Sequence, residues 1–217
     1  MFLSIKNVPN VSWSSKKPLN FKPKISTLFF LSFGLTLFGL GEGLLIVSAA
    51  GASPWSVLAQ GIHLNVGYSI GTITVFISFV VLLLWLPLNQ KPGIGTLLNA
   101  LIIGLMIDVC IRFISTPDEF ISQLILASIA VLTVGLGGGI YLVANLGAGP
   151  RDGLMIGLQK KTNLPIAAVR AFLEISVMSI GWYLGGTVGL GTLLFAFGIG
   201  PAVALSLYIV GKIFKTS

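Results

Sequence analysis

The sequence predicts an all-α transmembrane protein with six spanning helices. They would form two inverted three-helix repeats, each with a short surface or re-entrant helix after its first span. Three observations predict this fold class. Charged residues make up 9% of the chain and hydrophobic residues 55%, and the mean hydropathy is +1.00. One stretch of sequence occurs twice, 96 residues apart, and most Lys and Arg residues fall on one side of the predicted spans.

The composition excludes several classes of protein. A soluble domain carries about 25% charged residues, so this chain is expected to be embedded in a lipid bilayer. The net charge of +7 does not indicate nucleic-acid binding, because the basic residues lie in short polar joints and do not line one face. One His and one Cys, His63 and Cys110, are too few for a metal site, and no nucleophile–base pair is recognisable. We therefore expect no metal, no cofactor and no enzymatic activity.

The repeated stretch begins at Gly39 and again at Gly135. The first copy reads GLGEGLLIVSAAGASPWSVLAQGI and the second GLGGGIYLVANLGAGPRDGLMIGL. The match continues without a gap through Gly104 of the first copy and includes a second shared word, G-x-G-T-L-L. An ungapped match of this length indicates a duplicated unit, and we place the two units at residues 25–120 and 121–217.

Residues 1–24 contain five lysines and predict a disordered, cytoplasmic basic tail. A signal peptide is not expected, because the following apolar run is longer than a signal h-region. Six segments reach the roughly 20 apolar residues that a spanning helix needs. They cover about 25–48, 68–88, 94–115, 121–146, 165–185 and 190–211. Residues 54–66 and 150–163 each start with Pro, which suits a first helical turn, and each is too short to cross.

The orientation follows from the distribution of Lys and Arg. With the N-terminus in the cytoplasm, eleven of the 13 Lys and Arg residues fall on that side, Arg112 lies outside, and Arg170 lies within the fifth span. Both termini are therefore predicted to be cytoplasmic, in the inner membrane. Three spans per unit make the second unit enter from the opposite side. Many secondary transporters share this inverted architecture and bind their solute where the repeats meet.

The glycine-rich runs of the first and fourth spans have two interpretations. Small residues allow helix backbones to approach closely. Alternatively, the run that includes Gly137 and Gly138 loosens its helix near the midplane, so that backbone carbonyls face a cavity and bind solute. A phosphate-binding loop is excluded, because no strand precedes the glycines and no P-loop Lys follows them.

The second Gly-Ala-x-Pro word lies between Asn145 and Asp152. Gly147 and Gly149 precede a short helix whose free N–H groups and dipole favour negative charge. Asp152 would complement this dipole in a purely structural interpretation. Alternatively, the loop enters the protein and offers its N–H groups and Arg151 to an anionic substrate.

Four ionisable residues lie within predicted spans, where they normally face the bundle interior or a partner. Arg170 and Glu174 are spaced i,i+4, so they form either a structural ion pair or part of a solute site. Asp108 and Arg112 have the same spacing near an outer helix end, where side chains can reach the interface. Glu42 has no local partner, and we assign it as the proton- or cation-coupling carboxylate, with Asp108 as the second candidate.

Several words resemble the bacterial YczE/YitT-like integral membrane proteins: GASPW, GIGT, GAGPRDGLMIGL, VRAFLEI, GW and GLGT. The similarity runs from about Gly39 to Pro201. It implies a polytopic inner-membrane protein of a family whose biochemical activity is largely undefined and in which some members are regarded as transporters. Ser53 and Trp55 stand where the second copy has Gly and Arg, so the two loops are not equivalent.

The sequence therefore predicts a small secondary transporter or facilitator for an anionic or zwitterionic solute. Its path would run between the repeats, with Arg151, Arg170, Glu174, Asn145 and the glycines of the second copy binding solute. The alternative is a solute-binding or accessory membrane subunit that needs a separate partner. Both are compatible with a homo-oligomer or a partner subunit.

Overall fold

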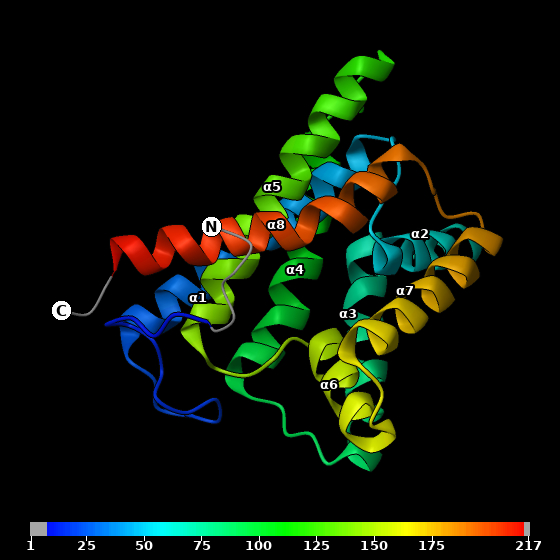
Figure 1. The fold of residues 1–217 in the computed structure, drawn as a ribbon. Helices are drawn as coiled ribbons and strands as arrows, with labels where there is room; N and C mark the ends of the chain where they lie inside the picture. Colours follow the sequence, from blue (N-terminus) through cyan, green and yellow to red (C-terminus); the bar gives the residue numbers. More distant parts are fainter. Residues whose placement is uncertain (1–7, 215–217) are drawn as a thin grey trace.

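The computed structural model describes residues 8–214, and every regular element in that range is a helix (Figure 1). Five helices are long and apolar enough to cross a membrane, and they agree closely with five of the six predicted spans. They are α1 (Ile25–Val47), α4 (Ile94–Phe113), α5 (Phe120–Ala144), α7 (Ile166–Tyr183) and α8 (Leu190–Ile213).

The predicted span at 68–88 is only partly present. Helix α3 (Ile70–Leu83) is too short to cross by itself and is followed by a 3-10 turn, η2 (Leu86–Leu88). Helix α2 (Pro54–Val66) directly precedes α3, and the two helices are bent by 114°. The described chain therefore has five candidate spans, or six if this bent pair forms one broken or re-entrant span.

The two predicted short helices are present as α2 and α6 (Pro150–Thr162), each of 13 residues. Each begins with Pro at its first position, where a missing N–H removes no helical hydrogen bond. Each is followed by a residue in the left-handed conformation, Gly67 (φ 78°) after α2 and Asn163 (φ 55°) after α6. Such residues end a helix, which keeps both elements short.

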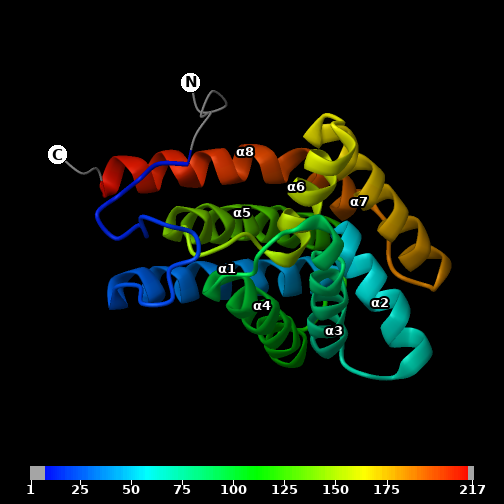
Figure 2. The same ribbon diagram turned by 90° about the horizontal axis from the view of Figure 1, so that it is seen from below.

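The eight α-helices pack in two groups, which lie side by side in Figure 2. In the first group α5 packs against both α1 and α8, and α4 packs on α1. The second group contains α2, α3, α6 and α7 around a cluster that includes Trp55, Trp85 and Leu154. The two groups meet where α3 packs on α4, and side chains from all eight of these helices line the space between the groups.

Close helix contacts explain the glycine-rich runs. A β-carbon on Gly41 of α1 would meet the backbone of Val134 in α5, and one on Gly137 of α5 would meet the backbone of Phe38 in α1. Both helices are continuous through their glycines. The close-packing interpretation is therefore confirmed for these positions, and the predicted loosening of the second run does not occur.

Pairs of contacts recur at a spacing of 96 residues. Helices α2 and α6, α3 and α7, and α4 and α8 start 96 residues apart. Gly95 N donates to Leu146 O at 2.8 Å, and Gly191 N, 96 positions later, donates to Ala50 O at 2.7 Å. The loop before α6 thus binds the start of α4, and the loop before α2 binds the start of α8.

The expectation of a disordered tail is wrong for residues 8–24. Trp13 is 3% exposed and stacks on Phe30 with ring centroids 4.4 Å apart. Ser15 N donates to Ala144 O at 3.1 Å, and Asn145 Nδ2 donates to Ser15 O at 2.8 Å. The buried apolar residues Val11 and Trp13 precede the four lysines of this segment, which stay exposed. Two lysines of the orientation count, Lys6 and Lys215, lie outside the described residues.

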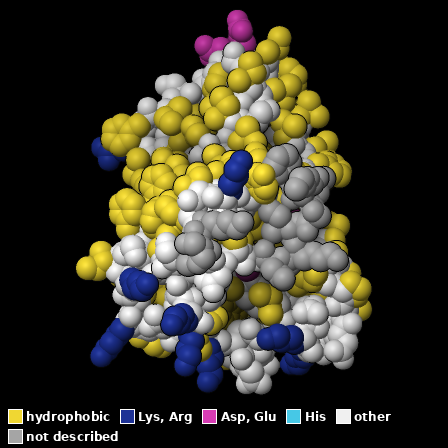
Figure 3. Space-filling view, turned by 60° about the vertical axis from the view of Figure 1, so that its left-hand side comes forward, with side chains coloured by type: hydrophobic (Ala, Val, Ile, Leu, Met, Phe, Trp, Pro, Cys, Tyr) yellow, Lys and Arg dark blue, Asp and Glu magenta, His cyan; other side chains and the backbone are white. Residues whose placement is uncertain are grey.

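Charge is distributed unevenly over the surface. On the face in Figure 3, Lys and Arg gather over the lower part, acidic side chains lie at the upper end, and hydrophobic side chains cover much of the surface between. Asp118 and Glu119, in the connection between α4 and α5, are exposed. This separation suits a membrane protein with one basic side, while the side that faces the cytoplasm stays a prediction.

Candidate functional site

A cavity of about 260 Å³ lies between the two groups of helices. The N-termini of α2 and α6 border it through Pro54 and Trp55 of α2 and Arg151 of α6. Its wall combines apolar groups with charged and polar ones. The charged and polar lining residues are Glu42, Ser53, Thr74, Ser78, Asn99, Tyr141, Arg151, Asp152, Arg170 and Glu174.

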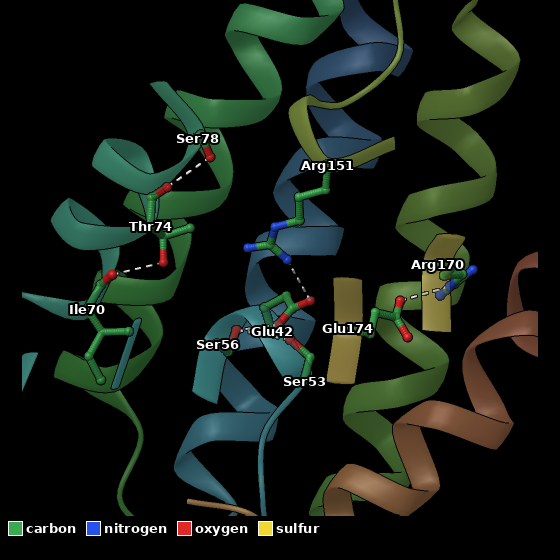
Figure 4. A network of polar contacts seen from close by, with 9 residues as sticks. All are labelled: Glu42, Ser53, Ser56, Ile70, Thr74, Ser78, Arg151, Arg170 and Glu174. Carbon is green, nitrogen blue, oxygen red and sulfur yellow. Dashed lines mark hydrogen bonds and ion pairs between the residues drawn. The ribbon is translucent and has the colours of Figure 1, made fainter. Parts of the chain in front are cut away.

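The carboxylate of Glu42 is the centre of a buried polar network (Figure 4). The side chain is 1% exposed, and its Oε2 accepts hydrogen bonds from Ser53 Oγ and Ser56 Oγ, each at 2.7 Å. The other oxygen, Oε1, lies 4.0 Å from Arg151 Nη1. Oε1 is buried and has no hydrogen-bond partner in the described chain. Because buried polar atoms normally have a partner, this oxygen is a candidate contact for a solute or an ion.

Arg151 is held between an acid and an aromatic ring. It is the second residue of α6, and its guanidinium carbon lies 5.3 Å from the centroid of the Trp55 ring in α2. A cation over an indole face is attracted by the ring quadrupole. The weak pairing with Glu42 and the flat Trp55 surface fix this guanidinium and leave N–H donors free for a carboxylate, the group that Arg binds best.

A second ion pair lies on α7. Arg170 Nε donates to Glu174 Oε1 at 2.8 Å, which confirms the geometry expected from the i,i+4 spacing. Figure 4 shows the Glu174 carboxylate turned toward Arg170 and away from Glu42. The Arg170 side chain is 48% exposed and that of Glu174 21% exposed. The pair is therefore more open than the Glu42 network.

Tyr141 and Asp152 complete the charged part of the wall. Tyr141 in α5 donates its hydroxyl hydrogen bond to Asp152 Oδ2 in α6. The aspartate that we expected only to complement the helix dipole therefore also ties α6 to α5. The cavity contains three carboxylates and two guanidinium groups, so charges of both signs face one small space.

The predicted site residues divide into three groups. Those that line the cavity are Glu42, Gly138, Gly149, Arg151, Arg170 and Glu174. Asn145 and Gly147 instead border a separate hollow beside the N-terminal segment, and Gly137 packs on α1. Asp108 lies in neither hollow and binds Ser69 Oγ at 2.6 Å.

Sequence reasoning missed the partners of Glu42. The expectation that this residue has no local partner is wrong, because the two serines and Arg151 surround it. Ser53 and Ser56 are spaced i,i+3 at the start of α2, which places both hydroxyls on one helix face. That spacing was the available signal, but their approach to α1 depends on tertiary packing.

Comparisons with known proteins show what the chain is similar to. Residues 25–207 match the model of DUF6198, described as a family of unknown function. An uncharacterized protein of Haemophilus influenzae is 40% identical over 209 residues, 96% of this chain and 95% of the relative. The uncharacterized membrane protein YczE of Bacillus subtilis is 33% identical over 181 residues, 83% of this chain and 81% of the relative. No solved structure gives a significant match.

Proposed function

Because the chain belongs to the DUF6198 family, a family of unknown function, we propose a function from the cavity itself: this polytopic membrane protein is a secondary transporter or facilitator of a small zwitterionic or anionic solute. The observation that carries the proposal is the set of opposite charges, including Arg151, Glu42 and Glu174, around one cavity among apolar helices. Ionisable groups at such positions are costly and commonly mark solute or ion pathways.

The chemistry of the wall favours a zwitterion over a simple anion. Arg151 offers free donors for a carboxylate, while Glu42 Oε1 is an acceptor for an ammonium group. The aromatic side chains of Trp55 and Phe38 also border the space and can contact a cation. A cavity of about 260 Å³ suits a small solute.

The two units at residues 25–120 and 121–217 are proposed to be inverted repeats. Reciprocal contacts at the 96-residue spacing support this arrangement: Gly41 packs on Val134 as Gly137 packs on Phe38. Two equivalent surfaces that meet in this way are typical of a pseudo-two-fold axis. The axis would pass between Trp55 and Arg151, which are counterparts at this spacing and contact each other.

Counterpart residues also line the cavity together. Thr74 and Ser78 of α3 correspond to Arg170 and Glu174 of α7, and all four border the space. The cavity would therefore lie on the pseudo-two-fold axis, where transporters built from inverted repeats bind their solutes. Alternating access would move one repeat against the other around this site.

A solute screen tests the proposal. Purified protein would be unfolded thermally with alanine or glycine betaine as zwitterions, lactate as an anion and tetramethylammonium as a cation. A ligand that binds only the folded state raises the midpoint of unfolding, and we expect the zwitterions to raise it most. The stabilising solute would then be loaded into proteoliposomes that contain this protein alone. Stabilisation without flux would contradict transport by the chain by itself.

The second candidate is a solute-binding or accessory subunit. It is favoured by α7, which packs on α2 and α6 but leaves large side chains such as Phe172 and Ile175 more than half exposed. Such a flank can face lipid or a partner subunit. Flux that requires addition of a second membrane protein to the same proteoliposomes would support this candidate.

A further inference from the structure

The two halves of the molecule differ in one helix contact. Helix α3 packs along α4, but its counterpart α7 makes almost no contact with α8. Figure 2 shows α3 beside α4, while α7 leans away from α8. Helix α7 instead packs on α2. This contact is more extensive than the equivalent one between α3 and α6. The halves therefore share their elements but hold α3 and α7 in different positions.

Small residues make the contact between α3 and α4. A β-carbon on Gly104 of α4 would lie 2.5 Å from Val75 Cγ2, and one on Gly71 of α3 would collide with Gly104 O. Both glycines are buried. Close approach of helix backbones thus requires glycine at both positions.

The same small residues are present in the other half without the contact. Gly200 of α8 corresponds to Gly104, yet a β-carbon there would have no neighbour within 4 Å. Ala167 and Ala171 of α7 correspond to Gly71 and Val75, and both are exposed. Helices α7 and α8 therefore carry surfaces small enough for close packing that do not meet in this conformation.

We propose that the protein has a second conformation in which α7 packs on α8 through Ala171 and Gly200, while α3 separates from α4. This inference rests on the proposed function. In a transporter built from inverted repeats, the alternate state forms when each repeat adopts the conformation that the other repeat has now. Arg170 and Glu174 then take the enclosed positions that Thr74 and Ser78, 2% and 5% exposed, hold now. The Arg170–Glu174 pair thereby closes one side of the cavity, and the other side opens because Thr74 and Ser78 move away with α3.

Asp108 holds the present conformation. Its Oδ2 accepts from Ser69 Oγ at 2.6 Å and its Oδ1 accepts from Gly71 N at 2.7 Å, so α4 binds the start of α3. The corresponding positions of the other half are Ala204, Pro165 and Ala167, which cannot form these bonds. The two conformations are therefore unequal in free energy, and loss of the Asp108 carboxylate favours the second one.

Disulfide cross-linking tests the second conformation. The variant carries Ala171→Cys and Gly200→Cys on a Cys110→Ala background and is oxidised in proteoliposomes, with each single-cysteine variant as a control. We expect a cross-link to form, and Asp108→Asn to accelerate it about tenfold, because hydrogen bonds to a charged group are among the stronger ones.

The inference would be overturned if no cross-link formed between positions 171 and 200 in either the Asp108 protein or the Asp108→Asn variant. Maleimide labelling of Gly200→Cys alone provides a second readout if a double variant does not fold, because α7 would shield this position only in the second conformation. An unchanged labelling rate with Asp108→Asn also contradicts it. Neither readout requires a solute, so a protein that cross-links but carries no solute would contradict the proposed transport and leave the two conformations established.

Discussion

Trp55 and Arg151 occupy the second position of the two short helices, 96 residues apart, and the guanidinium of one lies 5.3 Å from the ring centroid of the other. Equivalent positions of the two halves thus carry an aromatic ring and a cation in mutual contact. The contact holds Arg151 beside the cavity before any solute arrives. Such preorganisation lowers the entropic cost of binding.

Arg151→Lys should weaken binding of a stabilising zwitterion about tenfold or more. Lysine keeps the charge but loses the planar fork of donors and the stacking on Trp55. The dissociation constant, measured by titration of the purified variant, checks this expectation. Lys160→Arg, at the exposed far end of α6, is the matched control and should bind like the wild type. Equal affinity of Arg151→Lys and wild type would remove the guanidinium from the site.

The pairing of Glu42 with Arg151 predicts a stability pattern. Glu42→Gln and Arg151→Gln should each lower the stability of the folded state by about 1–3 kcal/mol, because each leaves the other charge without an opposite charge beside it. The double variant should recover part of that loss, since both charges are gone. Thermal unfolding of the four proteins measures the coupling. Additive losses in the double variant would show that the two side chains do not interact. If the double variant recovers stability but binds no solute, the pair is needed for binding as well as for packing.

Helix packing at Gly41 gives a prediction with an internal control. Gly41→Ala should destabilise by about 1–3 kcal/mol, because its β-carbon would lie 2.6 Å from Val134 N and the helices would have to separate. Gly200→Ala adds the same atom where nothing lies within 4 Å, and alanine favours a helix by roughly 0.5–1 kcal/mol over glycine. Its unfolding midpoint should equal or exceed that of the wild type. Similar losses for both variants would contradict the packing of α1 on α5.

Hydropathy and helix-start residues predicted most of the fold, because each is a local property. Pro54 and Pro150 marked the starts of the short helices where they occur. The length of α3 could not be predicted, because the apolar run continues past its end. There Trp85 turns inward and donates its indole N–H to Pro150 O at 2.9 Å, a contact between distant parts of the chain.

The candidate site was predicted only where its partners are close in sequence. Arg170 and Glu174 are one helical turn apart, so their pairing follows from spacing alone. Glu42 and Arg151 belong to different halves, and their approach requires α1 and α6 to meet. Asp108 was assigned to coupling from its position in a span, but its contacts with Ser69 and Gly71 depend on the placement of α3.

The N-terminal segment should contribute to stability despite its lysines. Trp13→Ala should lower stability by about 3 kcal/mol, because the ring is 3% exposed and packs on Phe30. Phe21→Ala is the control, since Phe21 is 70% exposed and its loss should have little effect. Thermal unfolding in detergent compares the two. If Trp13→Ala unfolds like the wild type, the segment is not held by this residue.

The orientation of the chain can be tested at two exposed connections. Lys91 lies between η2 and α4, and Thr116 lies between α4 and α5, so one complete span separates them. Because Lys and Arg residues gather on the cytoplasmic side, we expect Lys91→Cys to be protected from a membrane-impermeant maleimide in intact cells and Thr116→Cys to be labelled. Both variants carry Cys110→Ala, and both should react after the cells are opened. Labelling at Lys91→Cys with protection at Thr116→Cys would reverse the orientation while leaving the cavity unchanged, whereas labelling of both from outside would show that α4 does not cross the membrane.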